Sequence, residues 1–302
     1  MLSIVTLGIY SAWAKVRNNR YFYGNTEVAG QTFEYLAKPM DILKGRLIAF
    51  AAFVIYALSN AFVPALSLIL LLAFFAVLPW VVCKALAFRN YNTRYRNLRF
   101  GFDGQYKDAF VEFVVMPLAS LLTLGLLFPY VVYRQARFIV GNTRYGSHRL
   151  EPMFGAGEFY SIYLKALGIL VVAAVVFFVL MMTPLSPLAG ILFILAYLLV
   201  FAFIAAHSAN LIFSSTLLGE HGFESEQEPT TLAWIYLTNF LAIAVSLGLL
   251  IPWAKVRLAR YKAECLTLMA RDSLEAFFAA EEHETKALGE EVGEMFDLGI
   301  GV

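Results

Sequence analysis

The chain has 302 residues, of which 60% are hydrophobic and only 15% are charged. A soluble domain usually carries about 25% charged residues, so this composition is that of a membrane protein. The net charge of +1 excludes a strongly basic nucleic-acid-binding protein, and we expect no nucleic-acid partner.

Runs without charge mark the expected membrane helices. No charged residue occurs from Leu47 to Cys83 or from Ala166 to Gly219. A helix crosses the hydrocarbon core with about 20 residues, so each run is long enough for two helices. The expected turns contain Asn60 and Pro64 in the first run and Pro184 to Pro187 in the second.

Two shorter uncharged runs, residues 113–133 and 229–254, are each long enough to cross the membrane once. Backbone groups in lipid need partners within their own segment, so we expect all six apolar segments to be helical. The expected fold class is therefore an all-α polytopic membrane protein, a helix bundle. The apolar stretch from Leu2 to Ala14 is too short to cross, and no basic region precedes it as in a cleavable signal peptide.

An internal repeat connects these segments. The stretch from Thr6 to Arg17, TLGIYSAWAKVR, recurs from Ser246 to Arg257 as SLGLLIPWAKVR, and Arg-Tyr follows both at the same offset. A middle copy begins at Thr123 with Thr-Leu-Gly, and its Gly-Asn-Thr at 141–143 matches the one at 24–26. Self-similarity of this kind indicates a fold built from repeated units.

Two fainter copies close the intervening helix pairs, one around Trp80 and one around Phe203. In four of the five copies an aromatic residue precedes a Thr by 13 positions, and an apolar residue follows that Thr seven positions later. Aromatic rings with one polar group favour the depth of the lipid headgroups, so we expect interface anchors at the aromatic positions of the motifs. These anchors are Trp13, Tyr21, Trp80, Trp253 and Tyr261.

After each Asn-Thr, stretches such as Thr26 to Tyr35 alternate around a turn residue and predict short amphipathic β-hairpins at the helix ends. The repeats divide the chain into five expected parts. These are residues 1–40 (a truncated first motif repeat), 41–108 (a helix pair with the second motif), 109–230 (a central repeat of one apolar segment plus a helix pair), 231–262 (the last apolar segment with the terminal motif) and 263–302 (an amphipathic helix and an acidic tail).

The string TLGIYxxWAKVR, followed by Arg-Tyr and Asn-Thr, resembles the YjgN-type bacterial inner-membrane family. The stretch FDLGI at 296–300 is similar to the C-terminal signature of that family. The resemblance covers essentially the whole chain and implies a multi-pass protein of the bacterial inner membrane, but no activity, because the family has a domain of unknown function. Family members generally have a helix before the first motif, so we expect Met1 to be a late start or the chain to be a fragment.

The orientation in the membrane has two interpretations. All but three of the 23 Lys and Arg residues lie in four clusters, at 15–46, 84–107, 134–149 and 255–262. The positive-inside rule places all four clusters in the cytoplasm, which requires residues 113–133 and 229–254 to be re-entrant. The lengths of these two segments instead favour six crossings, with both chain ends cytoplasmic and with inverted repeats like those of many transporters. The sequence favours six crossings slightly.

The arginines of the motifs are candidates for binding lipid phosphates or an anionic solute. The simpler interpretation is that they fix the topology at the helix ends, where basic residues are common. The pairs are Arg17 and Arg20, Arg134 and Arg137, and Arg257 and Arg260.

Polar groups in or beside the apolar runs are further candidates, since a charge at the centre of a membrane helix costs roughly 2.5–3.5 kcal/mol. Lys165 is one of them, and His207 with Asn210 on one helical face is another. Lys165 can also extend to the interface from its helix start, and His207 aligns with Arg17 in the repeat, which favours a helix end. Asn239 is expected to form hydrogen bonds between helices.

After the last motif, five apolar residues share one side of an expected helix: Leu266, Met269, Leu274, Phe277 and Phe278. Acidic residues follow from Glu281 to Asp297. We expect an amphipathic helix on the membrane surface or in an oligomer contact, and then a solvated acidic end.

Two functions stay open for this integral inner-membrane protein. One is a transporter of a small solute or lipid, and the other is a non-enzymatic scaffold or anionic-lipid-binding protein. The sequence contains no catalytic constellation, no phosphate-binding glycine loop and no metal-ligand spacing, so we expect no enzymatic activity, cofactor or metal. The lipid bilayer, with anionic lipids in it, is the expected partner, and nothing in the sequence indicates the oligomeric state.

Overall fold

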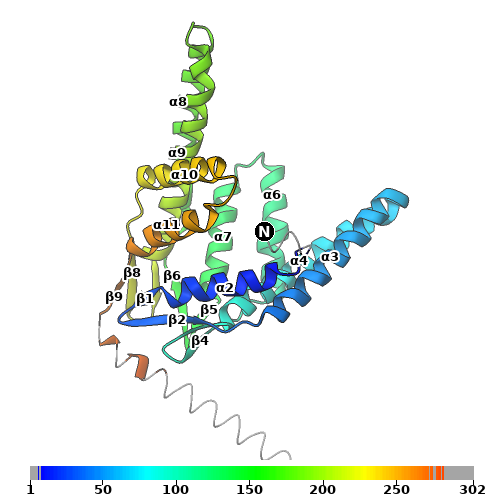
Figure 1. Cartoon of the computed structure of the whole chain (residues 1–302), viewed down its shortest axis with the longest axis vertical. Helices are drawn as coiled ribbons and strands as arrows, with labels where there is room; N and C mark the ends of the chain where they lie inside the picture. The colour runs from blue at the N-terminus through cyan, green and yellow to red at the C-terminus, as the bar shows by residue number, and fades with distance from the viewer. Residues whose placement is uncertain (1–5, 7, 272, 275–276, 280, 282–302) are drawn as a thin grey trace, which may run out of the picture. The chain divides into compact units, whose positions relative to one another are not determined.

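The computed structural model describes residues 6, 8–271, 273–274, 277–279 and 281 of the chain (Figure 1). It divides into two compact units, which are treated separately below. The first unit comprises the described residues of 1–122, 138–150 and 272–302, and the second comprises residues 123–137 and 151–271.

Helices and short strands alternate in both units. The first unit contains α2 (Ser11–Gly24), β1 (Glu27–Val28), β2 (Gln31–Tyr35), α3 (Pro39–Phe62), α4 (Pro64–Tyr91), β3 (Thr93–Tyr95), β4 (Leu98–Phe102), α5 (Tyr106–Phe110), the π-helical segment η1 (Val111–Val115), α6 (Met116–Leu122) and β5 (Thr143–Tyr145). The second unit contains α8 (Ala156–Met181), α9 (Ser186–Ser214), β7 (Thr216–Leu218), β8 (His221–Ser225), α10 (Pro229–Val245), α11 (Ile251–Glu264) and β9 (Leu266–Met269). Helix α7 (Phe128–Gly141) and strand β6 (His148–Pro152) run from one unit into the other.

The fold is not all-helical, so the all-α fold class expected from the apolar runs is wrong. Nine strands follow one another in a sheet in the order β1 to β9, and the registered pairs are antiparallel. The short hairpins expected at the helix ends are present, but they are joined to one another in the sheet. Strand β2 pairs with β3, and β4 pairs with β5, across the helices that separate them in the chain.

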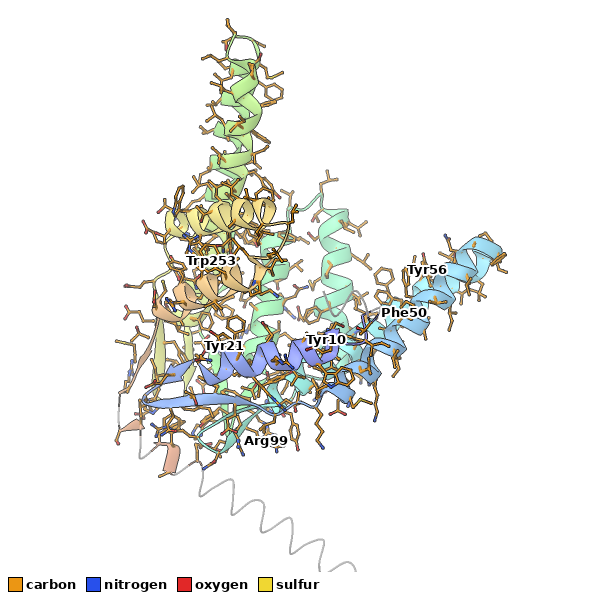
Figure 2. The ribbon with its side chains drawn as sticks, in the orientation of Figure 1. Tyr10, Tyr21, Phe50, Tyr56, Arg99 and Trp253 are labelled. Atoms are coloured by element: carbon orange, nitrogen blue, oxygen red, sulfur yellow. The ribbon has the colours of Figure 1, made fainter. Side chains whose placement is uncertain are left out.

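Four of the described helices, α3, α4, α8 and α9, are long and apolar enough to cross a membrane. Helices α3 and α4 run side by side, as do α8 and α9 (Figure 1). The expected turns of these two pairs are confirmed, because Pro64 begins α4 and the chain turns again between Met181 and Ser186. Side chains stand out around the first pair, where Phe50 and Tyr56 are labelled (Figure 2). These apolar surfaces are mostly exposed in the protein, as expected of helices that contact lipid.

The two shorter apolar runs are not single helices, contrary to the crossing that their length favoured. Helix α6 ends at Leu122 and α7 begins at Phe128, while α10 ends at Val245 and α11 begins at Ile251. The end of α10 is a Schellman motif, because the Gly248 N–H donates to the Ile243 carbonyl at 2.8 Å and the Leu247 N–H donates to Ala244 at 3.2 Å. This turn stops the helix and reverses the chain.

Each helical segment begins and ends on neighbouring strands. In the first unit, the N–H of Leu36 donates to the Asn92 carbonyl at 2.9 Å, and the N–H of Asp103 donates to Asn142 at 2.9 Å. In the second unit, Met153 donates in the same way to Ser215 at 2.7 Å, and Glu226 donates to Cys265 at 3.0 Å. The four chain segments between these contacts therefore leave the sheet and return to it at the same place.

The Asn-Thr of the repeat closes the C-terminus of each preceding helix. The Thr hydroxyl donates to the carbonyl four residues earlier in four copies, at 2.5–2.9 Å; the residues are Thr26, Thr93, Thr143 and Thr216. In three copies the preceding Asn amide also donates four residues back, at 2.7–2.8 Å. The last four carbonyls of a helix have no partner within it, so these side chains satisfy two of them. The constant spacing from motif aromatic to Thr therefore places the aromatic residue at a fixed distance before the capped end of its helix.

Replacing Thr143 with Val should lower the free energy of unfolding of the first unit by about 1 kcal/mol, since Val keeps the shape but loses the hydroxyl. The hydroxyl donates to Ile139 at 2.8 Å and accepts from Asn90 at 3.3 Å. Chemical denaturation of the purified protein in detergent measures the change. Thr32 is exposed, so Thr32→Val is the matched control and should stay within about 0.5 kcal/mol of the wild type. Equal effects of the two variants would contradict the capping role.

The strands of the first unit have one aromatic face and one basic face. Register places Phe33 opposite Tyr95 and Phe100 opposite Tyr145, with ring centroids 4.7 and 5.0 Å apart. On the other face Arg94 lies opposite Arg99, and Arg144 opposite Arg149. The aromatic face is the core of this unit. The two faces agree with the alternation from which short amphipathic hairpins were expected after each Asn-Thr.

The region after α11 differs from the expected amphipathic helix. Leu266 and Met269 lie in β9, which pairs with β8, so they belong to the sheet of the second unit. Phe278 is buried and packs in the first unit against Tyr95. The acidic stretch after Glu281 and the 296–300 signature lie outside the described residues.

Candidate functional site

The three full motifs form three helices of equal length. Helices α2, α7 and α11 each have 14 residues, and the repeat offset places their first residues at equivalent positions. A glycine precedes each helix by three positions with nearly the same backbone angle: Gly8 at φ +89°, Gly125 at φ +86° and Gly248 at φ +89°. Such a positive φ is readily available only to glycine, which explains why the motif needs Gly at this position.

In the second unit, α11 folds back on α10 through a polar contact around Asn239. The Asn239 amide donates to the Ala254 carbonyl at 3.2 Å, which confirms the expected hydrogen bonding between helices. Arg257 Nη1 donates to Thr238 Oγ1 at 2.5 Å and to Asn239 Oδ1 at 3.3 Å. The Arg257 guanidinium also lies 5.4 Å from the centre of the Trp253 ring, in cation–π range. The motif Trp and Arg therefore lie on one face of α11, where Figure 2 labels Trp253.

In the first unit, α2 packs on β2 through Val16, and Arg20, four positions later, lies on the same side of the helix. Val16 is buried against Tyr35 and Ala37 of the chain after β1. Arg20 reaches the Ala37 carbonyl at 3.5 Å, whereas Arg17 is exposed. Both arginines of the first motif are thus exposed.

In the middle motif both arginines contact tyrosines one turn earlier on α7. Arg134 is half-buried and its Nη1 lies 3.5 Å from the Tyr130 hydroxyl. Arg137 is exposed and donates to the Tyr133 hydroxyl at 2.6 Å. An Arg four residues after an aromatic residue is thus common to the middle and last motifs.

Five of the motif arginines form no ion pair with a carboxylate in the part of the chain that the structure describes. Within the described part of the chain, ion pairs to carboxylates involve Arg94, Arg144, Arg149 and His148. Five of the six motif arginines have no ion pair among the described residues: Arg17, Arg20, Arg137, Arg257 and Arg260. Unpaired guanidinium groups beside exposed aromatic rings match the chemistry of phosphate headgroups.

Four of the five expected aromatic anchors are exposed. Trp13, Trp80, Trp253 and Tyr21 are exposed large rings. Tyr261 is half-buried and forms hydrogen bonds with the backbone of Glu228, accepting from its N–H at 2.7 Å. Hydroxyls of Thr231 and Thr230 donate to the Glu228 carboxylate, which lowers the pKa of this exposed group.

The polar groups proposed for a transport path do not form one site. Asn210 is used by the fold, because its amide donates to the Gln227 carbonyl at 2.9 Å and its oxygen accepts from Ser225 and Gln227 at 2.9 and 2.8 Å. His207 Nδ1 lies 3.0 Å from the Phe203 carbonyl of its own helix. Lys165 is exposed on α8. Each group thus has a different environment.

The apolar turns before the motif helices were missed by sequence reasoning. Leu124 and Leu247 have positive φ angles of 52° and 50°, and these two leucines are 95% and 94% exposed. A leucine in this conformation is strained, and strained residues that persist often have a functional reason. The signal was present as Leu-Gly at the same position of all three full motifs.

Comparisons with known proteins show the family of the chain. The chain matches, over residues 1–295, the family described as bacterial protein of unknown function (DUF898). The chain belongs to that family. It is 24% identical to inner membrane protein YjgN of Salmonella typhimurium over an alignment of 330 residues, which covers 87% of this chain and 82% of that protein.

The match to inner membrane protein YjgN of Escherichia coli O157:H7 is shorter. It is 30% identical over 129 residues, which cover 42% of this chain and 32% of that protein, about a third of its length. The same values hold for the protein of Escherichia coli K12. No solved structure is significantly similar to the chain. With its apolar helices, the chain is an integral membrane protein of a bacterial inner-membrane family whose function is unknown.

Proposed function

We propose that this protein is a non-enzymatic scaffold of the inner membrane that binds anionic phospholipid headgroups with the arginines of its motif helices. The observation that carries the proposal is that each helical segment ends beside the strand from which it left, on the neighbouring strand of the sheet. Glu226 and Cys265, before α10 and after α11, are hydrogen-bonded at 3.0 Å, and Asp103 and Asn142 are bonded at 2.9 Å. Segments that return in this way keep the basic clusters at one end of every hairpin.

This arrangement removes the conflict between the two orientation rules. If no segment crosses only once, all four basic clusters lie on one side of the bilayer, as the positive-inside rule prefers. Helix pairs α3–α4 and α8–α9 then cross and return, while the α10–α11 hairpin enters and leaves the same leaflet as a re-entrant element. The strands and the motif arginines would face the cytoplasm.

The exposed turns support insertion of the shorter hairpins into lipid. Leu247 stands at the tip between α10 and α11 and is almost fully exposed, as is Leu124 in the middle motif. Fully burying a leucine side chain contributes about 1.5–3 kcal/mol. Insertion of the tip therefore offsets the backbone strain at Leu247, which is of the order of 1–2 kcal/mol.

The expected effect of the arginines on lipid affinity follows from surface electrostatics. Each Arg near an anionic leaflet contributes about 1 kcal/mol to membrane attraction. Arg17 and Arg260 are exposed and take part in no ion pair within the described residues, so replacing them leaves the fold intact. The double variant Arg17→Gln, Arg260→Gln should therefore bind phosphatidylglycerol about 30-fold more weakly than the wild type.

The measurement is titration of labelled phosphatidylglycerol against the protein in phosphatidylcholine nanodiscs. The matched control is Arg94→Gln with Arg149→Gln, which removes the same charge from arginines already paired with Glu34 and Asp103. The control should keep wild-type affinity. Equal lipid binding by the wild type and the Arg17/Arg260 variant would exclude the motif arginines as headgroup ligands.

A transporter of a small solute or lipid is the other function that the sequence left open. It rested on Lys165, His207 and Asn210, and the hydrogen bonds of Asn210 to β8 and its following residues give that side chain a structural role. No observation on the described residues favours transport over headgroup binding, so the scaffold is the function proposed.

A further inference from the structure

We propose that the β5–β6 turn and the rings beside it form a recognition site for a short segment with an aromatic residue followed three positions later by a carboxylate. The occupant is the chain's own segment, with Phe278 and Glu281 as the two recognised residues. This site lies in the first unit, it uses none of the motif arginines, and it does not depend on lipid binding. It assigns a role to the region that the sequence predicted to be a surface helix.

The carboxylate of Glu281 is held by four polar contacts at the turn. The backbone N–H of Ser147 donates to Oε2 at 2.8 Å, and the Ser147 hydroxyl lies 2.9 and 3.1 Å from the two carboxylate oxygens. His148 Nδ1 is 2.5 Å from Oε1. Glu281 is only 1% exposed. A buried carboxylate is tolerated only when it is fully hydrogen-bonded or paired, and this one is.

The aromatic half of the site is a three-sided pocket around Phe278. Its ring centroid is 5.5 Å from that of Tyr95 and 6.0 Å from that of Tyr145, both in edge-to-face geometry. The guanidinium carbon of Arg96 lies 4.5 Å from the Phe278 centroid. Phe278 is 8% exposed as a result. Arg96 itself is fixed by donation to the Ala29 carbonyl at 2.8 Å, so the cation is in place before the ring binds.

The specificity comes from two residues that distinguish this turn from its repeat. Tyr145 pairs with His148 across the β5–β6 hairpin as Tyr95 pairs with Leu98 across β3–β4. Where β5–β6 has Ser147 and His148, the β3–β4 hairpin therefore has Asn97 and Leu98. A leucine cannot donate to a carboxylate, so the β3–β4 turn lacks the contact that His148 makes, and Asn97 replaces the Ser147 hydroxyl. Of these two turns, only the β5–β6 turn has the complete set of contacts for the Glu281 side chain.

Amide hydrogen exchange of the full-length protein in nanodiscs tests the site. The Ser147 N–H should exchange slowly in the wild type, because it is bonded to Glu281. In Glu281→Ala and in Phe278→Ala its exchange should be at least about tenfold faster. Glu224→Gln, an exposed carboxylate on β8, is the control and should leave Ser147 unchanged. Exchange in the β3–β4 strands reports whether the sheet is intact in each variant.

A synthetic peptide of residues 273–281 distinguishes recognition from simple packing. Added to the Phe278→Ala variant, it should restore slow exchange at Ser147, while the same peptide with Glu281→Gln should be much weaker. Unchanged Ser147 exchange in both variants, with intact β3–β4 strands, would overturn the proposal. Failure of the wild-type peptide to restore protection would likewise show that the turn does not recognise the segment.

Discussion

Replacement of Tyr145 with Ala is expected to lower the free energy of unfolding of the first unit by about 3–5 kcal/mol. Tyr145 is 1% exposed and lies at the centre of the aromatic face, with ring contacts to Tyr95, Phe100 and Phe278. Its hydroxyl donates to the Tyr95 carbonyl at 3.0 Å. The substitution removes both the packing and the hydrogen bond, and it leaves a cavity that rigid strands cannot fill.

Chemical denaturation in detergent, followed by amide exchange of the β3–β5 strands, measures this loss. Tyr145→Phe keeps the ring and removes only the hydroxyl, so its effect should be about 1 kcal/mol. Tyr91→Ala removes an exposed tyrosine near the same sheet and should cost well under half as much as Tyr145→Ala. If Tyr145→Ala and Tyr91→Ala were equally mild, the aromatic face would not be the core of this unit.

The helix pairs and the repeat could be predicted from the sequence because both depend on local patterns. Charge-free runs show where two long helices fit, and Pro64 marks a helix start because proline suits the first turn. The aromatic-to-Thr spacing is likewise local, since Thr143 and its equivalents cap the helix in which the spacing is counted. Such features require no knowledge of which distant segments meet.

The sheet could not be predicted because its pairing is not local. Strands β3 and β5 have three residues each, and Arg94 and Arg144 occupy the middle position of both. Strands of this length carry too little alternation to be recognised, and the pairing of β4 with β5 joins residues separated by a helical segment. The contact between Ser147 and Glu281 could not be predicted for the same reason, because the two residues are 134 positions apart in the chain.

The candidate site was predicted in part. The motif arginines lie where helix periodicity placed them, with Arg257 and Trp253 on one face of α11. Asn210 was proposed as part of a polar path because it lies in an apolar run, but its partners are the residues that follow β8. A single sequence cannot distinguish a polar group that binds a solute from one that fixes a strand. The distinction depends on what the fold brings to that side chain.

The second large effect is expected in the sidedness of the α10–α11 hairpin. In a background without Cys83 and Cys265, single cysteines replace Glu226 before α10 and Glu264 at the end of α11. Because Glu226 donates to Cys265 at 3.0 Å, both sites lie at the base of one hairpin. Both should therefore react with a membrane-impermeant maleimide only after the inner membrane is opened. A cysteine at Thr183, in the turn between α8 and α9, should react from the outside without opening and serves as the control for the opposite face.

The expected difference is all-or-none, because a segment either returns or crosses. Equal protection of positions 226 and 264 in closed membranes, with labelling at 183, places the hairpin base and its arginines Arg257 and Arg260 on the cytoplasmic side. The motif helix then lies beside anionic lipids of that leaflet, where its unpaired cations have a partner. Labelling of 226 and 264 from opposite faces would mean that residues 229–254 cross once. The inverted repeat plan of transporters would then replace the scaffold as the function to test.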